Sequence, residues 1–129
     1  MKAWGSVALA AVVATSSVAH GRTMTNTVRS GTTALMYEYG NVRENCAQQG
    51  GIIKVRTRPQ HGKLSQRSGV STIGYVRFPE QAACGGTKVI GVHVYYVSDP
   101  GFHGTDHFSL EVIYPHHDVD VDTFTVNVQ

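Results

Sequence analysis

The sequence predicts an all-β fold, an antiparallel β-sandwich of seven to eight short strands in one domain. Three observations predict it. Apolar and polar residues alternate with a period of two in several segments, turn residues rich in glycine separate these segments, and Val, Thr, Tyr and Phe are abundant after residue 19. Such alternation, frequent turns and β-branched or aromatic residues are typical of antiparallel sheets and not of helices.

The strongest strand signals lie in the second half of the chain. In residues 108–114 and 123–128, aromatic and aliphatic side chains occupy alternate positions, which predicts strands with one face in the core. Residues 88–98 are apolar on both sides, which predicts a central strand covered on both faces. Shorter strands are predicted at residues 34–39, 52–57, 62–65 and 73–78.

The N-terminus has the pattern of a cleavable signal peptide. Lys2 provides a positive charge, residues 7–14 form an apolar core, and Ser17-Val18-Ala19 fits the small-x-small cleavage rule. We expect cleavage between Ala19 and His20, which leaves residues 20–129 as one periplasmic or secreted domain. The apolar run is shorter than the roughly 20 residues that span a bilayer, so no membrane span is expected.

Two cysteines follow the predicted signal peptide, Cys46 and Cys84. Because disulfides persist in exported proteins, we expect one intramolecular bond between them. Two free thiols or an intermolecular bond are the alternatives. Neither cysteine belongs to a C-x-x-C pair, which argues against thiol redox catalysis.

Charge is distributed unevenly along the chain. Lys and Arg lie before residue 91, whereas residues 91–129 contain acidic residues and five of the seven histidines. The basic residues are spread out and are not interleaved with aromatic residues, so the sequence does not predict nucleic-acid binding.

Residues 95–110 (YYVSDPGFHGTDHFSL) resemble the Y-x-P-x-x-x-F-x-G-x-D-x-F-x-Y stretch of bacterial cadherin-like and immunoglobulin-like repeat domains. Residues 59–64 (PQHGKL) are similar to the P-x-x-G-x-[LV] segment that precedes it, and residues 124–128 (FTVNV) are similar to the final strand. The resemblance implies an immunoglobulin-like sandwich of the kind found as adhesive or spacer modules. The chain departs from the family in standing alone and in placing two cysteines around a longer middle section.

The matched stretch also has a physical interpretation. Gly101 and Gly104 permit backbone conformations that a Cβ would penalise. Asp106 opens a strand, where its carboxylate can accept hydrogen bonds from N–H groups of the Gly101–Thr105 turn. We therefore expect Gly101, Gly104 and Asp106 to build a turn and not to act in catalysis.

The histidines of the C-terminal third are candidate metal ligands, since imidazole binds Zn²⁺ and Cu²⁺. If the turns around residues 101 and 115 lie at opposite ends of the sandwich, however, the cluster is split in two. Histidines exposed to solvent in turns are then the favoured interpretation. The candidate ligands are His103, His107, His116 and His117.

Three acidic residues at alternate positions, Asp118, Asp120 and Asp122, are candidate calcium ligands. The twelve-residue calcium loop is absent, and an acidic edge strand that prevents aggregation explains the same residues.

No G-x-S-x-G motif, H-E-x-x-H motif or phosphate-binding glycine loop occurs in the sequence, so we do not expect an enzyme or a required cofactor. The favoured hypothesis is an exported, non-catalytic immunoglobulin-like module with a binding or structural role and a protein or glycan partner at the cell envelope. The alternative is an exported protein that binds Zn, Cu or Ca through its His- and Asp-rich C-terminal loops.

Overall fold

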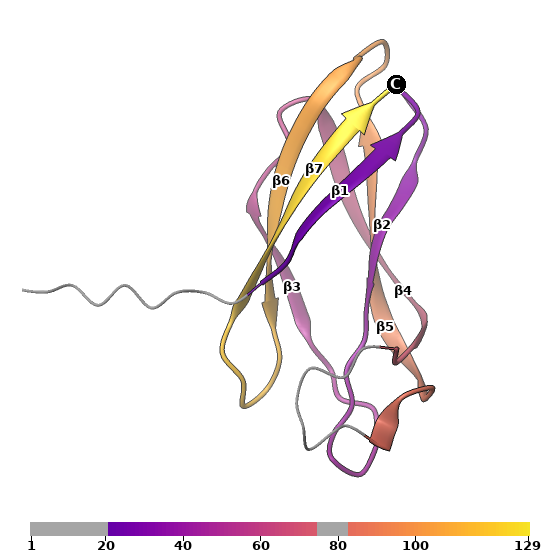
Figure 1. The fold of residues 1–129 in the computed structure, drawn as a ribbon, viewed down its shortest axis with the longest axis vertical. Helices are drawn as coiled ribbons and strands as arrows, with labels where there is room; N and C mark the ends of the chain where they lie inside the picture. Colours follow the sequence, from indigo (N-terminus) through magenta and orange to yellow (C-terminus); the bar gives the residue numbers. More distant parts are fainter. Residues whose placement is uncertain (1–20, 75–82) are drawn as a thin grey trace, which may run out of the picture.

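The computed structural model describes residues 21–74 and 83–129, which form seven β-strands in two sheets (Figure 1). These residues contain no α-helix, and therefore no helix that could cross a membrane. The predicted all-β class is confirmed. The strands are β1 (Thr23–Val28), β2 (Ala34–Tyr39), β3 (Ile52–Thr57), β4 (Gly62–Thr72), β5 (Lys88–Ser98), β6 (Gly104–Ile113) and β7 (Asp120–Val128).

Two predictions fall outside the described residues. The signal peptide and its cleavage site lie in residues 1–20, and most of the strand expected at 73–78 lies in residues 75–82. The described part of that segment, Ile73 and Gly74, follows the end of β4 and is not in a strand.

The four-stranded sheet has the order β1-β7-β6-β3, and the three-stranded sheet has the order β2-β5-β4. All neighbours are antiparallel except β1 and β7, which run parallel. The predicted central position of residues 88–98 is confirmed by β5. The expectation that both faces of this strand are covered is wrong for its second half, where only one face lies in the main core. Val94 and Tyr96 are fully buried there, whereas Tyr95 and Val97, which point the other way, are partly exposed.

The main core lies between the two sheets. The ring of Phe108 on β6 stacks on Phe124 of β7, with centroids 4.4 Å apart, and lies 6.1 Å from the ring of Tyr96 on β5. These three side chains, together with Val94 and Leu110, are at most 1% exposed. Since burying a large apolar side chain contributes roughly 1.5–3 kcal/mol, this cluster is the main source of sheet-to-sheet cohesion.

A smaller core closes the lower end of the molecule in Figure 1. Val42, Ile73 and Val89 pack there around Cys84, which is disulfide-bonded to Cys46 with a Cα–Cα distance of 5.2 Å. The predicted intramolecular bond is confirmed. It ties the loop between β2 and β3 to the segment between β4 and β5.

The first strand, β1, was not predicted. Its sequence TMTNTV places threonines on the outer face, so the apolar alternation is weak. The strand forms because it pairs along its whole length with β7, where Thr23 lies beside Thr123 and Thr25 beside Thr125.

Candidate functional site

Asp106 is a buried carboxylate that joins a loop to both sheets. Its side chain accepts hydrogen bonds from the backbone N–H groups of Gln60 (3.0 Å) and His61 (3.1 Å) and from its neighbour His107 (2.9 Å). It also accepts one from the hydroxyl of Tyr96 on the opposite sheet, at 2.8 Å. The carboxylate thus accepts loop N–H groups, as expected, but the loop is the β3–β4 connection and not the Gly101–Thr105 turn.

That turn depends on its two glycines for a different reason. Gly101 has φ +80° and Gly104 has φ +143°, which are conformations that L side chains rarely adopt. The turn therefore directs the chain from β5 in one sheet to β6 in the other, and it brings Asp106 to the loop that it holds.

Burial and hydrogen bonds determine the protonation states of Asp106 and Tyr96. Burial raises the pKa of the Asp106 carboxyl, but the hydrogen bonds from Tyr96 and from the three backbone N–H groups outweigh it, so the pKa is lowered. Burial, and then the Asp106 carboxylate, raise the pKa of the Tyr96 hydroxyl. At neutral pH the two side chains are a carboxylate and a phenol that bind each other across the core.

This arrangement predicts a defined loss of stability in acid. A carboxyl whose pKa is lower in the folded state contributes stability that is complete above its unfolded pKa, about 3.9, and is lost as pH falls through the folded pKa. We expect the free energy of unfolding of the wild type to decrease below about pH 4. In Asp106→Asn the part of this decrease that comes from the Asp106 carboxyl should be absent. Urea unfolding at a series of pH values measures it, and equal acid sensitivity of the two proteins would contradict the assignment.

A second tyrosine–aspartate pair crosses the core nearer the other end. The hydroxyl of Tyr39 on β2 donates to Asp122 on β7 at 2.7 Å, and the backbone N–H of Arg22 donates to the same carboxylate at 2.9 Å. Burial is the main cause that raises the pKa of Tyr39, followed by Asp122. Asp120 and Asp122 are 7% and 4% exposed, and β7 lies between β1 and β6. The interpretation of an acidic edge strand is therefore wrong.

The candidate metal ligands are not brought together. His103 lies in the β5–β6 turn and His107 on the outer face of β6, whereas His116 and His117 lie beyond the far end of β6. The length of β6 separates the two pairs, as the sequence suggested. Within residues 21–74 and 83–129, no group of three or more His, Cys, Asp or Glu side chains is placed to hold a metal ion, and this includes the Asp118–Asp122 segment.

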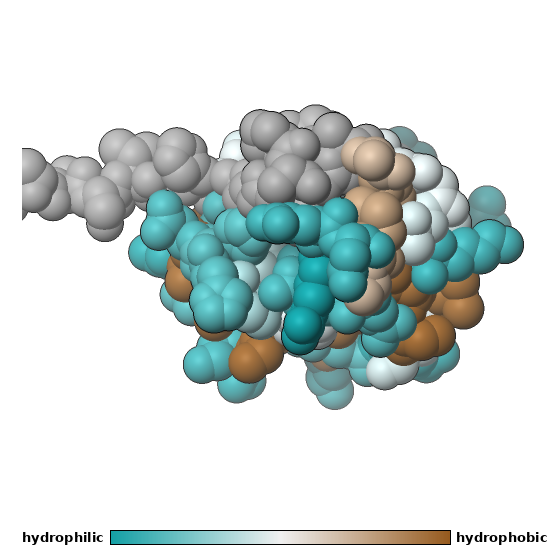
Figure 2. Space-filling view, turned by 90° about the horizontal axis from the view of Figure 1, so that it is seen from below, coloured by the Kyte–Doolittle hydropathy of each residue, from teal (hydrophilic) through white to brown (hydrophobic). Residues whose placement is uncertain are grey.

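A hollow on the surface lies at the end that carries the disulfide, and we call it the loop-end hollow. It has a volume of about 790 Å³ and is formed by the loop after β2 and the β6–β7 turn. Figure 2 looks onto this end, where the described residues are mostly hydrophilic. The lining residues are Arg43, Glu44, Asn45, Gln49, Gly50, Pro115, His116 and His117.

The two loops that form this hollow are tightly built. A bridge between Val42 and Gln48 closes the first loop, and the backbone N–H of Arg43 donates to the carbonyl of Ala47 at 2.8 Å. Cys46 in this loop and His116 in the other are the described non-glycine residues with positive φ, both +63°. Such conformations persist only where the surrounding structure imposes them, and they concentrate at binding sites.

A narrower space continues from the loop-end hollow into the gap between the sheets. It has a volume of about 130 Å³, shares Gln49 and Gly50 with the hollow, and reaches Tyr39, Val92 and Tyr114. A Cβ on Gly51 would lie 2.5 Å from the ring of Tyr114, so glycine is required for that ring to pack there. The loop-end hollow thus has a polar lining, and the narrower space beside it is partly lined by tyrosine rings.

Sequence reasoning found only His116 and His117 in this site. The other lining residues lie in a loop whose course depends on the disulfide, and no motif marks them. The expected bond between Cys46 and Cys84 was the one feature of the sequence that pointed to an ordered loop around Cys46.

Comparison with known proteins gives little further guidance. No protein-family model and no curated protein matches the sequence. Among solved structures, the solution structure of amebosin is similar with a TM-score of 0.48 and 14% sequence identity, over 85% of this chain and 98% of amebosin.

Proposed function

We propose that the protein is an exported, non-catalytic, immunoglobulin-like module that binds a protein or glycan partner at the cell envelope through the loop-end hollow. The observation that carries the proposal is the hollow itself, in which two loops, one of them tied by the disulfide, present charged and amide side chains at one end of the molecule. Loops held by a stable sheet scaffold are a common place for recognition surfaces.

The order of the strands supports the immunoglobulin-like assignment. If β2 to β7 are taken as strands B to G, one sheet contains B, E and D and the other contains C, F and G. For these six strands the partition is that of constant-type immunoglobulin domains, whereas β1 lies beside β7 and not beside β2. The Asp106 network also joins the two segments, 59–64 and 95–110, whose sequences resemble cadherin-like repeats.

Export is supported by two independent features. Residues 1–19 have the order of charge, apolar core and small residues typical of a signal peptide. The disulfide belongs to a compartment in which cysteines are oxidised, because thiols in the cytosol are kept reduced.

The chemistry of the hollow suits binding more than catalysis. Arg43, Glu44 and Asn45 are exposed to solvent, and water weakens the electrostatic interactions that an active site uses. The same groups offer donors and acceptors in a fixed arrangement, as recognition of a polar partner requires. The carboxamides of Asn45 and Gln49 supply both kinds of group.

A direct test compares two charge deletions in the loop-end hollow with a third at the opposite end of the molecule. The protein is screened against an array of envelope glycans and by crosslinking in envelope extract, and the affinity for any partner is then measured for Arg43→Ala and Glu44→Ala. We expect at least one of these variants to bind about tenfold more weakly, because a charge-assisted contact is lost. Arg29→Ala, between β1 and β2, is the matched control and should bind normally.

Equal affinity of all three variants would exclude the loop-end hollow as the recognition surface. Zn²⁺ titration of the same proteins tests the alternative function. Saturable, stoichiometric Zn²⁺ binding that is lost in His116→Ala and His117→Ala would replace the proposal by a metal-binding role.

A further inference from the structure

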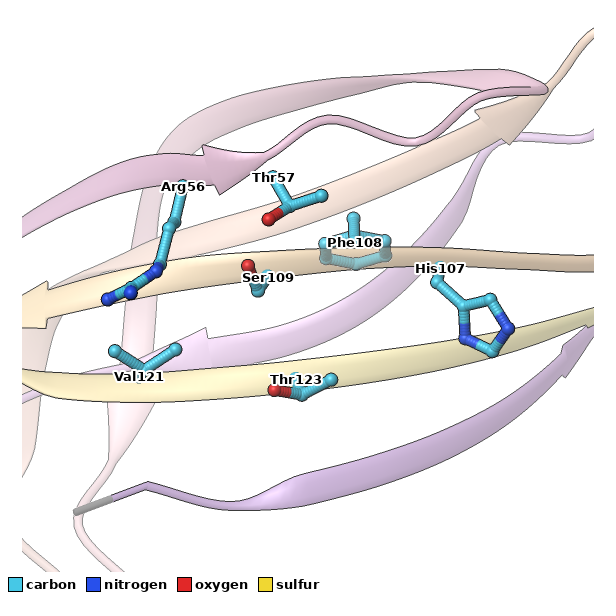
Figure 3. A pocket seen from close by; sticks show the side chains of 7 residues that line it. All are labelled: Arg56, Thr57, His107, Phe108, Ser109, Val121 and Thr123. Atoms are coloured by element: carbon cyan, nitrogen blue, oxygen red, sulfur yellow. The ribbon is translucent and has the colours of Figure 1, made fainter. Parts of the chain in front are cut away.

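A second hollow lies on the outer face of the four-stranded sheet, away from the loop end, and we call it the outer groove. It has a volume of about 410 Å³ and crosses β3, β6 and β7. Figure 3 shows the side chains around it, with Ser109 at the middle and larger residues on either side. The lining residues that matter here are Arg56, Thr57, His107, Ser109, Val121 and Thr123.

A β-bulge in β3 positions Arg56, the positively charged residue of this groove. Val55 lies opposite Leu110, which is buried, and Thr57 lies opposite Ser109, so the register between β3 and β6 shifts at Arg56. A bulge inserts one residue and re-aims its side chain. In Figure 3 the side chain of Arg56 extends over the outer face toward Val121.

The guanidinium is only weakly neutralised. Its ion pair with Glu111 is 3.8 Å long, and the two side chains are 54% and 34% exposed, a class of pair that contributes little. Lys54 lies directly beside Glu111 on the neighbouring strand, so one carboxylate faces two cations. This part of the face therefore has an excess of positive charge.

The other polar groups of the groove are available to a ligand. The hydroxyls of Thr57, Ser109 and Thr123 have no hydrogen-bond partner within the part of the chain that the structure describes. The Nδ1 atom of His107 lies 3.2 Å from the hydroxyl of Thr125, which leaves its Nε2 atom free to bind at the other end of the groove.

Hydroxyl groups continue beyond the groove onto the edge of the sheet. Thr123 and Thr125 on β7 pair in register with Thr23 and Thr25 on β1. Along β6, Glu111 lies four positions after His107, a distance of about 13 Å. The hydroxyl and charged groups thus surround a mostly apolar groove over a length that suits two sugar rings.

From these groups we infer that the outer groove binds an acidic oligosaccharide. The Arg56 guanidinium binds the carboxylate or sulfate, since its planar donors match an oxyanion. The threonine and serine hydroxyls and His107 bind the sugar hydroxyls. Phe108 also lines the groove, but it is only 1% exposed and its ring is stacked in the core, so it cannot stack on a sugar and the charge is required. This site is independent of the loop-end hollow.

The test is an NMR titration of the ¹⁵N-labelled, oxidised protein with four probes. These are a galacturonate disaccharide, a sulfated disaccharide, a neutral maltose and inorganic sulfate. We expect amide shifts at residues 56–57, 107–109 and 121–125 with the acidic sugars, and smaller shifts with sulfate alone. Comparison of the two acidic sugars decides whether the anion is a carboxylate or a sulfate. Added salt should weaken binding because the contact is exposed.

Two variants make the result specific. Arg56→Gln should weaken binding of the acidic disaccharide about tenfold or more, whereas Arg67→Gln, an exposed arginine on β4 of the other sheet, should not. Ser109→Val keeps the guanidinium but fills the middle of the groove, and it should also weaken binding. Melting curves check that the variants are folded. Binding of maltose as tight as that of the acidic sugars, or shifts confined to the loop-end hollow, would overturn the inference. Equal effects of Arg56→Gln and Arg67→Gln, or no shifts with either acidic sugar, would overturn it as well.

Discussion

Replacing Asp106 by asparagine is expected to lower the free energy of unfolding by about 3–5 kcal/mol. One carboxylate oxygen accepts from Gln60 and His107, and the other from His61 and Tyr96. In Asp106→Asn an NH₂ group replaces one of the two oxygens. Whichever oxygen it replaces, its N–H groups then face two other donors, and two hydrogen bonds are lost. Each hydrogen bond to a charged group contributes roughly 1.5–3 kcal/mol, so the loss of two accounts for the expected change. Urea unfolding at neutral pH measures it.

Two further variants show whether the cost belongs to this network. Tyr96→Phe removes a single bond and should cost about 1.5–3 kcal/mol, while Asp99→Asn, an exposed carboxyl in the adjacent turn, should cost almost nothing. If Asp106→Asn were no more costly than Asp99→Asn, the structural role would be excluded. Melting with and without chelator should give the same difference between wild type and Asp106→Asn. A difference that appears only with Zn²⁺ would make Asp106 a metal ligand instead.

Three strands were predicted to the residue. Segments 34–39, 52–57 and 88–98 coincide with β2, β3 and β5, because alternating or apolar runs end at turn residues on both sides. The predicted segments 62–65, 108–114 and 123–128 overlap β4, β6 and β7 but miss one or both of their true ends. In β1 the apolar residues are only Met24 and Val28, so nothing local separates this strand from a polar loop. Its existence depends on pairing with β7, a contact across about a hundred residues of sequence, which no local pattern reports.

Side-chain roles were predicted less well than strands, because they depend on neighbours in space. Asp122 was interpreted as part of an acidic edge, yet β7 is flanked on both sides and Tyr39 binds the carboxylate inside. For Asp106 the hydrogen-bonding role followed from its place at the start of a strand, but the partner loop did not. Arg56 gained its position over the outer groove from a bulge, which the sequence does not mark.

Breaking the Cys46–Cys84 bond is expected to lower the free energy of unfolding by about 4 kcal/mol. The cysteines are 38 residues apart, and in the chain-entropy model releasing a loop of that length from the unfolded state has about this effect. The change should be concentrated at one end, because Cys84 belongs to the small core with Val42 and Val89 and not to the main core. Urea unfolding of the reduced protein measures the total.

Hydrogen exchange then shows where the stability is lost. Amides of residues 42–48 and 84–89 should exchange much faster after reduction, whereas those of β6 and β7, which hold the main core, should remain the most protected. The double variant Cys46→Ala/Cys84→Ala is the control, since reductant should not change it. The same variant should lose affinity at the loop-end hollow while keeping the outer groove intact, because only the first site is built from the tethered loop. A cost below about 1 kcal/mol, or exchange that rises evenly over both sheets, would show that the bond does not organise this end of the molecule.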